Sequence, residues 1–261
     1  MTRPFLSVII PAYNEESRIG DALGKIVDYL TAQHYTWEVI VADDGSTDST
    51  AALVEACRLK DGRIKLECLP HGGKGWAVRN GMLAASGDYR FMCDADLAMP
   101  IEYLSSFLEK LSEGYDIVIG SRQIEGARRF NESALRHALG RLFNWSVRLI
   151  AVREFQDTQC GFKCMRGDVA ERVFRLQQTK GWGFDVELLY LALKMNMRVF
   201  ELPVDWYHDP SSKLRVGIDS LWMIKDTLQV RIRDLFGKYN FDNIGCKGPS
   251  GALTKRSGDR K

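Results

Sequence analysis

Carboxylates follow two apolar runs of the chain, at positions where a ligand can reach them. Asp94 and Asp96 follow the run at residues 89–93, and Asp43 and Asp44 end an earlier run. Because residues i and i+2 of an extended chain point to the same side, Asp94 and Asp96 can face one ion. Such a pair suits a hard divalent cation that bridges phosphates, and a carboxylate at a strand end can also accept hydrogen bonds from a base or a ribose hydroxyl. A solvated turn is the alternative for an isolated Asp-Ala-Asp, since Asp commonly forms turns.

Positive charge is concentrated in two segments, although the formal net charge is only +2. Residues 121–153 carry seven Arg against two Glu, and residues 238–261 carry six Lys and Arg against two Asp. This uneven distribution indicates an anionic partner at the first segment. It argues against a nucleic-acid partner, because a nucleic-acid binder carries positive charge over a whole face.

Short β-rich runs alternate with amphipathic stretches over residues 5–120, which predicts an α/β fold with a mostly parallel sheet flanked by helices. The expected strands are Leu6–Pro11, Trp37–Asp43, Ile64–Leu69, Tyr89–Asp94 and Asp116–Gly120, and the expected helices lie near 15–32, 47–60, 75–86 and 100–113. Ligands of such sheets bind beyond the carboxyl ends of the strands. The residues that follow each apolar run are therefore the candidate site.

The pattern changes after residue 121. It predicts a basic amphipathic helix at about 132–152, a loop at DTQCGFK, a helix from near Gly183, a strand near 198–204 and a last helix at about 216–236. Residues 238–261 are rich in Gly, Ser, Lys and Asp, and we expect them to form a disordered basic tail.

Several classes of protein are excluded by what the sequence lacks. Neither GxGxxG after the first strand nor GxxxxGK[ST] occurs, which excludes dinucleotide-binding dehydrogenases and P-loop nucleotide hydrolases. The first apolar run is too short for a signal peptide, and no stretch approaches the roughly 20 apolar residues of a membrane span. The six cysteines form no CxxC pair, so we expect reduced thiols of a cytoplasmic protein and no zinc.

Seven motifs, in order along the chain, resemble those of a known family. SVIIPAYNEE, VIVADDGSTDST, GGKGWAVRNGM, CDADLAMP and GSR are similar to the successive motifs of inverting family-2 glycosyltransferases with the GT-A fold. DTQCGFK and GWGFDVELL narrow the resemblance to the branch that includes dolichyl-phosphate β-glucosyltransferases and, less closely, dolichyl-phosphate mannose synthases. The similarity covers about residues 5–236. It implies a GT-A domain over 1–237, with a nucleotide-sugar half at 5–120 and an acceptor and membrane-interface half at 121–237.

The resemblance implies a donor site at the strand ends and a metal ion within it. Asp94 and Asp96 would hold Mg²⁺ or Mn²⁺ against the diphosphate of the nucleotide-sugar, with Asp96 counted among the catalytic residues. The residues expected to bind the nucleotide-sugar are Pro11, Tyr13, Glu15, Asp43, Asp44, Lys74, Asp94, Lys213 and Arg215. A solvated position is the alternative for Lys74, and a solvated loop for Lys213 and Arg215.

The acceptor site is expected in the basic segment. Arg122 and Arg136 match positions that hold the acceptor phosphate in the resembling synthases, and a guanidinium fork suits phosphate geometry. A pairing of Arg136 with Glu132 one turn earlier is the alternative. A polyprenyl phosphate has a second pKa of about 6 and is itself a nucleophile near neutral pH, so a general base is optional. The resemblance places Asp157 and Asp185 near the reacting sugar, where either one can orient the acceptor, bind sugar hydroxyls or act as a base.

Two amphipathic helices bear on location. The first carries an apolar stripe at helical spacing and three arginines beside it, which is typical of a helix in the membrane interface as well as of a core helix: Leu135, Leu139, Leu142, Phe143, Val147 and Ile150, with Arg136, Arg141 and Arg148. The last helix offers a second such surface or a homodimer contact through Leu221, Trp222, Ile224, Leu228, Ile232, Leu235 and Phe236. We expect a peripheral protein on the cytoplasmic face of a membrane.

The expected activity is inverting transfer of glucose from UDP-glucose to a polyprenyl, dolichyl-type phosphate, giving a β-linked product. The alternatives are a polyprenyl-phosphate mannose synthase that uses GDP-mannose and a glycosyltransferase with another acceptor. A binding module that has lost its chemistry is a further class, and it would lack a metal carboxylate or an acceptor arginine. Both carboxylates and both arginines are present.

Overall fold

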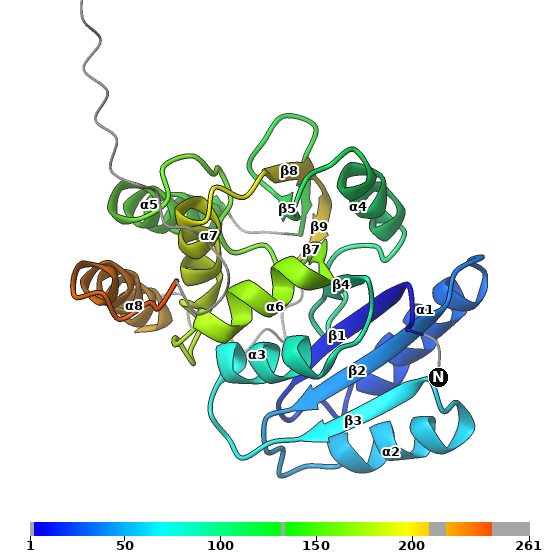
Figure 1. Ribbon diagram of the computed structural model, residues 1–261. Helices are drawn as coiled ribbons and strands as arrows, with labels where there is room; N and C mark the ends of the chain where they lie inside the picture. The colour runs from blue at the N-terminus through cyan, green and yellow to red at the C-terminus, as the bar shows by residue number, and fades with distance from the viewer. Residues whose placement is uncertain (1–2, 132–133, 209–217, 242–261) are drawn as a thin grey trace, which may run out of the picture.

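The computed structural model describes residues 3–131, 134–208 and 218–241. Within these ranges the side chains of residues 134–139, 142–143 and 218–220 are outside the description. Two expected donor-site cations, Lys213 and Arg215, therefore lie outside the described residues, as does the side chain of Arg136. The described part is an α/β fold with one large sheet between two layers of helices (Figure 1).

In the part of the chain that is described, seven strands form the large sheet in the order β3-β2-β1-β4-β7-β5-β8. Every neighbouring pair is parallel except β7, which runs antiparallel to both β4 and β5. A separate parallel pair joins β6 to β9. The bounds are β1 (Leu6–Ala12), β2 (Trp37–Asp43), β3 (Ile64–Cys68), β4 (Tyr89–Met92), β5 (Ile117–Ser121), β6 (Arg128–Phe130), β7 (Lys163–Arg166), β8 (Val199–Pro203) and β9 (Asp205–Tyr207).

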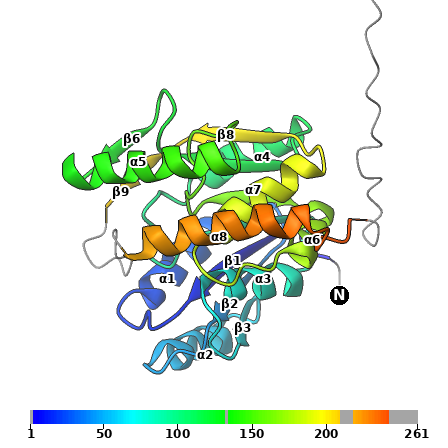
Figure 2. The same cartoon turned by 90° about the vertical axis from the view of Figure 1, so that its left-hand side faces the viewer.

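The helices divide between the two faces of the sheet. One face is covered by α1 (Ile19–Thr31), α2 (Thr50–Lys60) and α4 (Tyr103–Ser112), and the other by α3 (Lys74–Ala84), α6 (Gly167–Leu176) and α7 (Phe184–Lys194). Two further helices, α5 (Ala134–Ile150) and α8 (Ile218–Leu235), pack against each other, and α8 also packs on α7. Figure 2 shows α5 and α8 side by side on this flank of the molecule.

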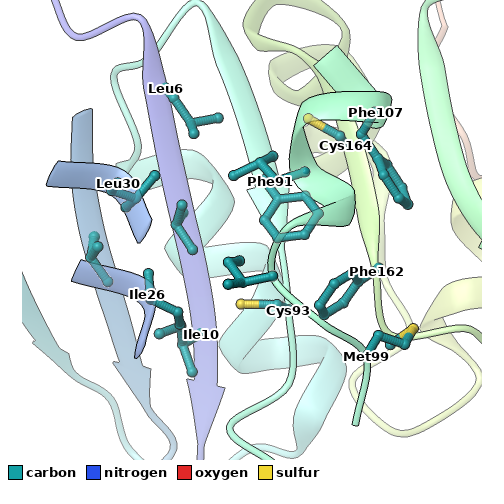
Figure 3. Packing of buried hydrophobic residues seen from close by; sticks show 14 of the residues in the cluster. Leu6, Ile10, Ile26, Leu30, Phe91, Cys93, Met99, Phe107, Phe162 and Cys164 are labelled. Carbon is teal, nitrogen blue, oxygen red and sulfur yellow. The ribbon is translucent and has the colours of Figure 1, made fainter. Parts of the chain in front are cut away.

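The alternation of side chains along β1 explains why the core has two parts. Leu6, Val8 and Ile10 point to the face under α1, whereas Ile9 points to the face under α3. On the first face, the ring of Phe91 packs edge to face against Phe107 and Phe162, at centroid distances of 5.7 and 5.0 Å (Figure 3). Phe162 directly precedes β7, so this aromatic cluster anchors the start of that strand.

The expected fold class and its alternation of strands and helices are confirmed. Four elements were not expected, namely β6, β7, α6 and β9, and the supposed loop DTQCGFK ends in the first residue of β7. The second helix begins at Thr50 rather than near 47, because the Asp48 carboxylate accepts a hydrogen bond from the Thr50 backbone N–H at 2.9 Å. Residues 238–241 of the expected disordered tail are described, and Tyr239 is buried.

Of the apolar stripe expected on the basic helix, the side chains of Val147 and Ile150 are described, and neither is exposed. Val147, one of its members, is fully buried in the core, whereas Trp145 and Leu149 on the same helix are exposed. On α8, by contrast, most of the expected apolar residues are exposed. None of the helices in the described ranges is long and apolar enough to cross a membrane.

Candidate active site

The ends of several strands meet at one edge of the sheet, and the reversed direction of β7 brings a further segment there. Lys163, the first residue of β7, is in register with Met92 at the end of β4 and with Ile119 near the end of β5. The segments that follow β4 and β5 and the segment that precedes β7 therefore lie together. They carry Asp94, Arg122 and the loop from Asp157 to Phe162.

Two lysines are paired with carboxylates at this edge. Lys74 Nζ, at the start of α3, lies 2.5 Å from Asp94 Oδ1, and both side chains keep some exposure, 18% and 26%. Lys163 Nζ lies 2.5 Å from Asp185 Oδ1 and also donates to the carbonyl of Cys160. The Lys163 side chain has no exposed surface. The first pair is reachable by a ligand, whereas the second is a buried support behind it.

The carboxylates after β4 stand in contrasting environments. Burial tends to raise the pKa of Asp94, but the positive charges of Lys74, Lys163 and Arg122 hold this pKa below its usual value. Burial, together with the charge of Asp94, raises the pKa of Asp96. Asp94 Oδ2 rests against Gly161, where a Cβ would come within 2.1 Å of this oxygen. The close approach to glycine backbone leaves the Asp94 carboxylate in a defined place beside Asp96.

These two carboxylates are a suitable donor set for Mg²⁺ or Mn²⁺. In proteins Mg²⁺ is typically bound through one or two carboxylates together with substrate phosphates and water. The described residues contain no group of three or more His, Cys, Asp or Glu arranged to hold a metal ion.

Arg122 and Asp157 form a bidentate ion pair on the other side of the edge. The Arg122 Nε and Nη2 atoms donate to the two oxygens of Asp157 at 2.7 and 2.9 Å, and the Arg122 backbone N–H adds a third bond of 2.9 Å. Burial opposes ionisation, but Arg122 lowers the pKa of Asp157 from 3.8 to about 2. The guanidinium groups of Arg122 and Arg129 lie 5.5 and 5.7 Å from the ring of Trp206. Two cations therefore lie near one aromatic ring.

The loops after β1, β2 and β3 form the opposite side of the candidate site. Tyr13 stacks on His71 with ring centroids 4.4 Å apart. Both oxygens of Asp44 accept hydrogen bonds of 2.8 Å, from the N–H groups of Gly72 and Gly73. Asp44 therefore shapes the glycine-rich loop.

Three further expected residues lie on this side. Asp43 accepts a hydrogen bond from the Ser46 hydroxyl. Glu15 is paired with Arg18, and Pro11 lies within β1. All three are close to the ends of β1 and β2, where the expected nucleotide pocket lies.

The chain matches the family model for glycosyl transferase family 2 over residues 7–173. It belongs to this family. Three relatives are dolichyl-phosphate beta-glucosyltransferases: one from Dictyostelium discoideum, 36% identical over 89% of this chain and 76% of the relative, one from Drosophila melanogaster, 37% over 93% and 79%, and one from Homo sapiens, 34% over 91% and 78%.

Solved structures of glucosyl-3-phosphoglycerate synthase from Mycobacterium tuberculosis share the fold. A complex with phosphoglyceric acid has a TM-score of 0.64 and 21% identity, covering 87% of this chain and 80% of the other. A complex with Mn²⁺, UDP-glucose and phosphoglyceric acid has a TM-score of 0.62 and 19% identity, covering 87% and 79%. The GT-A fold expected from the motifs is confirmed.

In this glycosyltransferase the structure brings together most of the expected site residues and adds others. The expected acids at residues 94, 96, 157 and 185 and the cations Lys74 and Arg122 lie along one edge of the sheet. Sequence reasoning did not single out Lys163, although a lysine inside the apolar run from Cys160 to Met165 is a signal of a buried charge. Arg129 and Trp206 gave no comparable signal, because their proximity to Arg122 depends on the pairing of β6 with β9.

Proposed function

We propose that the protein transfers glucose, with inversion, from UDP-glucose to a dolichyl-type polyprenyl phosphate. The observation that carries this proposal is the gathering of paired acids and cations at one edge of the sheet, in a chain whose relatives are named dolichyl-phosphate beta-glucosyltransferases. An enzyme that joins two anionic substrates needs positive charge on both sides of the reacting sugar. Lys74 supplies it on the donor side, and Arg122 on the acceptor side.

On the donor side, the loops after β1 to β3 bind the nucleotide. Tyr13 and His71 offer a stacked aromatic surface for the base, and Asp43 offers a carboxylate for a base N–H. Asp94 and Asp96 would hold Mg²⁺ or Mn²⁺ at the diphosphate. The ion, when bound, neutralises charge that develops on the leaving nucleotide. A neighbour of the same fold is known in complex with Mn²⁺ and UDP-glucose, which supports the choice of donor and ion.

On the acceptor side, a phosphate oxygen is the nucleophile. It forms a bond to the anomeric carbon while the bond from that carbon to the donor diphosphate breaks, and attack opposite the leaving group turns an α-linked donor into a β-linked product. A doubly ionised phosphate needs no proton removed, since its second pKa of about 6 lies below neutral pH. The guanidinium groups of Arg122 and Arg129, both near the ring of Trp206, hold this phosphate.

This chemistry gives different tasks to Asp157 and Asp185, the two acids whose roles the sequence left undecided. Asp157 is a poor base with a pKa of about 2, and both of its oxygens are bonded to Arg122, so it positions that guanidinium. Burial raises the pKa of Asp185 despite the neighbouring ammonium of Lys163. Asp185 and Lys163 together form a neutral buried support behind Asp94, next to the place of the sugar.

The acceptor lipid is met at a membrane surface on the cytoplasmic side. Large apolar side chains are exposed along α8 and on the neighbouring part of α5: Leu221, Trp222, Leu228, Ile232, Leu235 and Phe236, with Trp145 and Leu149. The exposed cations Lys225 and Arg231 lie among them on α8. Aromatic and apolar residues flanked by basic ones are typical of helices in the membrane interface. A homodimer through α8 is the alternative use of this face.

The test is transfer of labelled sugar into lipid that can be extracted with organic solvent. Purified protein is supplied with dolichyl phosphate in vesicles and with either labelled UDP-glucose or labelled GDP-mannose. The proposal expects glucose transfer that falls about a hundredfold or more in Asp96→Asn. It expects little change in the control Asp168→Asn, whose exposed carboxylate lies at the opposite end of β7. Preference for GDP-mannose, or unchanged transfer by Asp96→Asn, contradicts it.

A further inference from the structure

The first turn of α3, which begins at Lys74, is packed, backbone to backbone, on a second segment, residues 177–183, here called the clamp segment. The Trp76 N–H donates to the Lys180 carbonyl at 3.0 Å, and the side-chain amide of Gln177 donates to the Gly75 carbonyl at 3.1 Å. A Cβ at Gly75 would come within 2.5 Å of the Thr179 carbonyl. Only glycine allows the two segments to approach so closely.

The contact continues on both sides of Lys74. Gly73 has a φ of +105°, and a Cβ there would lie 2.7 Å from the Lys180 carbonyl oxygen. The Lys74 ammonium itself lies 4.9 Å from the ring of Trp182, within the clamp segment. The clamp segment therefore determines where the Lys74 side chain leaves the backbone and which surface it lies against.

A buried carboxylate holds the clamp segment from behind. Glu187 of α7 has no exposed surface, and its Oε2 accepts hydrogen bonds from the N–H groups of Gln178 and Thr179 at 3.1 and 2.7 Å. Its Oε1 accepts from the Tyr239 hydroxyl at 2.5 Å and from Arg233 at 3.3 Å. A carboxylate with this burial depends on each of its donors, because an unpaired buried charge is costly.

Tyr239 reaches this network from the segment that follows α8. It is only 4% exposed, and its hydroxyl is the closest donor to Oε1 of Glu187. Contacts thus lead from Tyr239 to Glu187, from Glu187 to the clamp segment, and from that segment to Gly75 and Trp76. These two residues follow Lys74, which pairs with Asp94.

We propose that Glu187 and Tyr239 are positioning residues for the donor site, which hold Lys74 in place through the clamp segment. The part of this inference that concerns the donor rests on the proposed function, in which Lys74 meets the nucleotide diphosphate. The mechanical part, coupling of Tyr239 to the first turn of α3, rests on the contacts alone. Tyr239, which follows α8, is thus part of the structure that positions the donor site.

The chain offers a matched control for the test. Tyr190 of α7 is also 4% exposed, and its hydroxyl also donates to a carboxylate, that of Asp234 in α8, at 2.6 Å. The clamp segment takes no part in that bond. Tyr239→Phe and Tyr190→Phe therefore each remove one hydrogen bond from a buried tyrosine to a carboxylate, and only the bond of Tyr239 ends on Glu187, which holds the clamp segment.

Two measurements are made on both variants. In Tyr239→Phe, the rate of amide hydrogen exchange at Trp76 and Thr179 is expected to rise about three- to tenfold, because part of the stability lost with one hydrogen bond is lost at these amides. In Tyr190→Phe the rate at both amides is expected to stay unchanged. The KM for UDP-glucose is expected to rise by a similar factor in Tyr239→Phe with kcat nearly constant, since Lys74 binds the donor before and during the reaction. Glu187→Gln, which keeps the volume but loses one acceptor oxygen, is the second variant if Tyr239→Phe does not fold.

The outcomes separate the two inferences. Equal exchange at Trp76 in both variants, or faster exchange confined to residues 177–183, overturns the coupling. Faster exchange at Trp76 in a protein that transfers no glucose supports the coupling and contradicts the proposed function. Faster exchange with an unchanged KM in an active enzyme overturns the link to the donor.

Discussion

The pair formed by Arg122 and Asp157 allows a quantitative prediction from a double-mutant cycle. The pKa of Asp157 falls from 3.8 to about 2 although burial opposes ionisation. At about 1.4 kcal/mol per pH unit, this fall corresponds to about 2 kcal/mol of stabilisation. The attraction to Arg122 must also offset the cost of burial, so we expect a coupling energy of about 3 kcal/mol between the two side chains.

The sign of the pH dependence follows from the lowered pKa. A carboxylate with a folded-state pKa below its unfolded-state value contributes stability that is present above the unfolded value of 3.8. That contribution is lost as the pH falls toward 2. The difference in unfolding free energy between the wild type and Asp157→Asn is therefore expected to stay constant from pH 7 to pH 5 and to shrink below about pH 4.

The assay is urea unfolding of the wild type, Asp157→Asn, Arg122→Gln and the double variant, with sugar transfer measured on the same four proteins. If Asp157 acts by positioning Arg122, the double variant is no less active than Arg122→Gln alone, because the acid has nothing left to position. A coupling energy below about 0.5 kcal/mol refutes the ion-pair reasoning. If the fall in sugar-transfer rate at low pH disappears in Asp157→Asn, Asp157 acts as a general base instead.

Three further outcomes are expected. Gly161→Ala places a methyl group 2.1 Å from an oxygen of Asp94, so it should weaken Mn²⁺ binding about tenfold in a titration. Unchanged binding shows that Asp94 is not a ligand. Lys163→Met leaves the buried Asp185 without its cation and should lower the unfolding free energy by about 3 to 5 kcal/mol. A loss below about 1 kcal/mol means that the pair is dispensable for stability. Trp222→Ser, on the exposed face of α8, should reduce partition onto anionic vesicles about tenfold without lowering the Tm. Unchanged partition shows that Trp222 of α8 does not contact the membrane.

The parallel half of the fold was predictable because its strands are long apolar runs separated by amphipathic helices. The second strand, Trp37–Asp43, has the expected bounds, and the third ends at Cys68, one residue before the expected end. The strand β7 was not predictable. Its four residues, KCMR, show no alternation, and nothing in so short a segment indicates that it pairs antiparallel with both β4 and β5.

The site shows a similar division between residue type and pairing. Strand-end acids such as Asp94 and Asp96 were predictable, because ligands of α/β sheets bind at that edge. The partners were not, since Arg122 and Asp157 are 35 positions apart and Lys163 and Asp185 are 22 apart. Contacts of that separation depend on tertiary packing.

The burial of Tyr239 was hidden for a related reason. The residues around it are rich in Gly, Asn and Lys, which favours a disordered tail. Its ring packs into the hydrophobic core, and its hydroxyl donates to a buried carboxylate that is 52 positions away. Composition reports average tendencies over a segment and does not register one specific contact.

The central claim, that the carboxylates after β4 hold an ion against the donor diphosphate, is tested most directly by a crystal of the protein grown with Mn²⁺ and UDP. The expected result is an anomalous peak for Mn²⁺ in contact with Asp94, Asp96 and the UDP phosphates. A peak elsewhere, or UDP bound with both carboxylates turned away from its phosphates, contradicts the account.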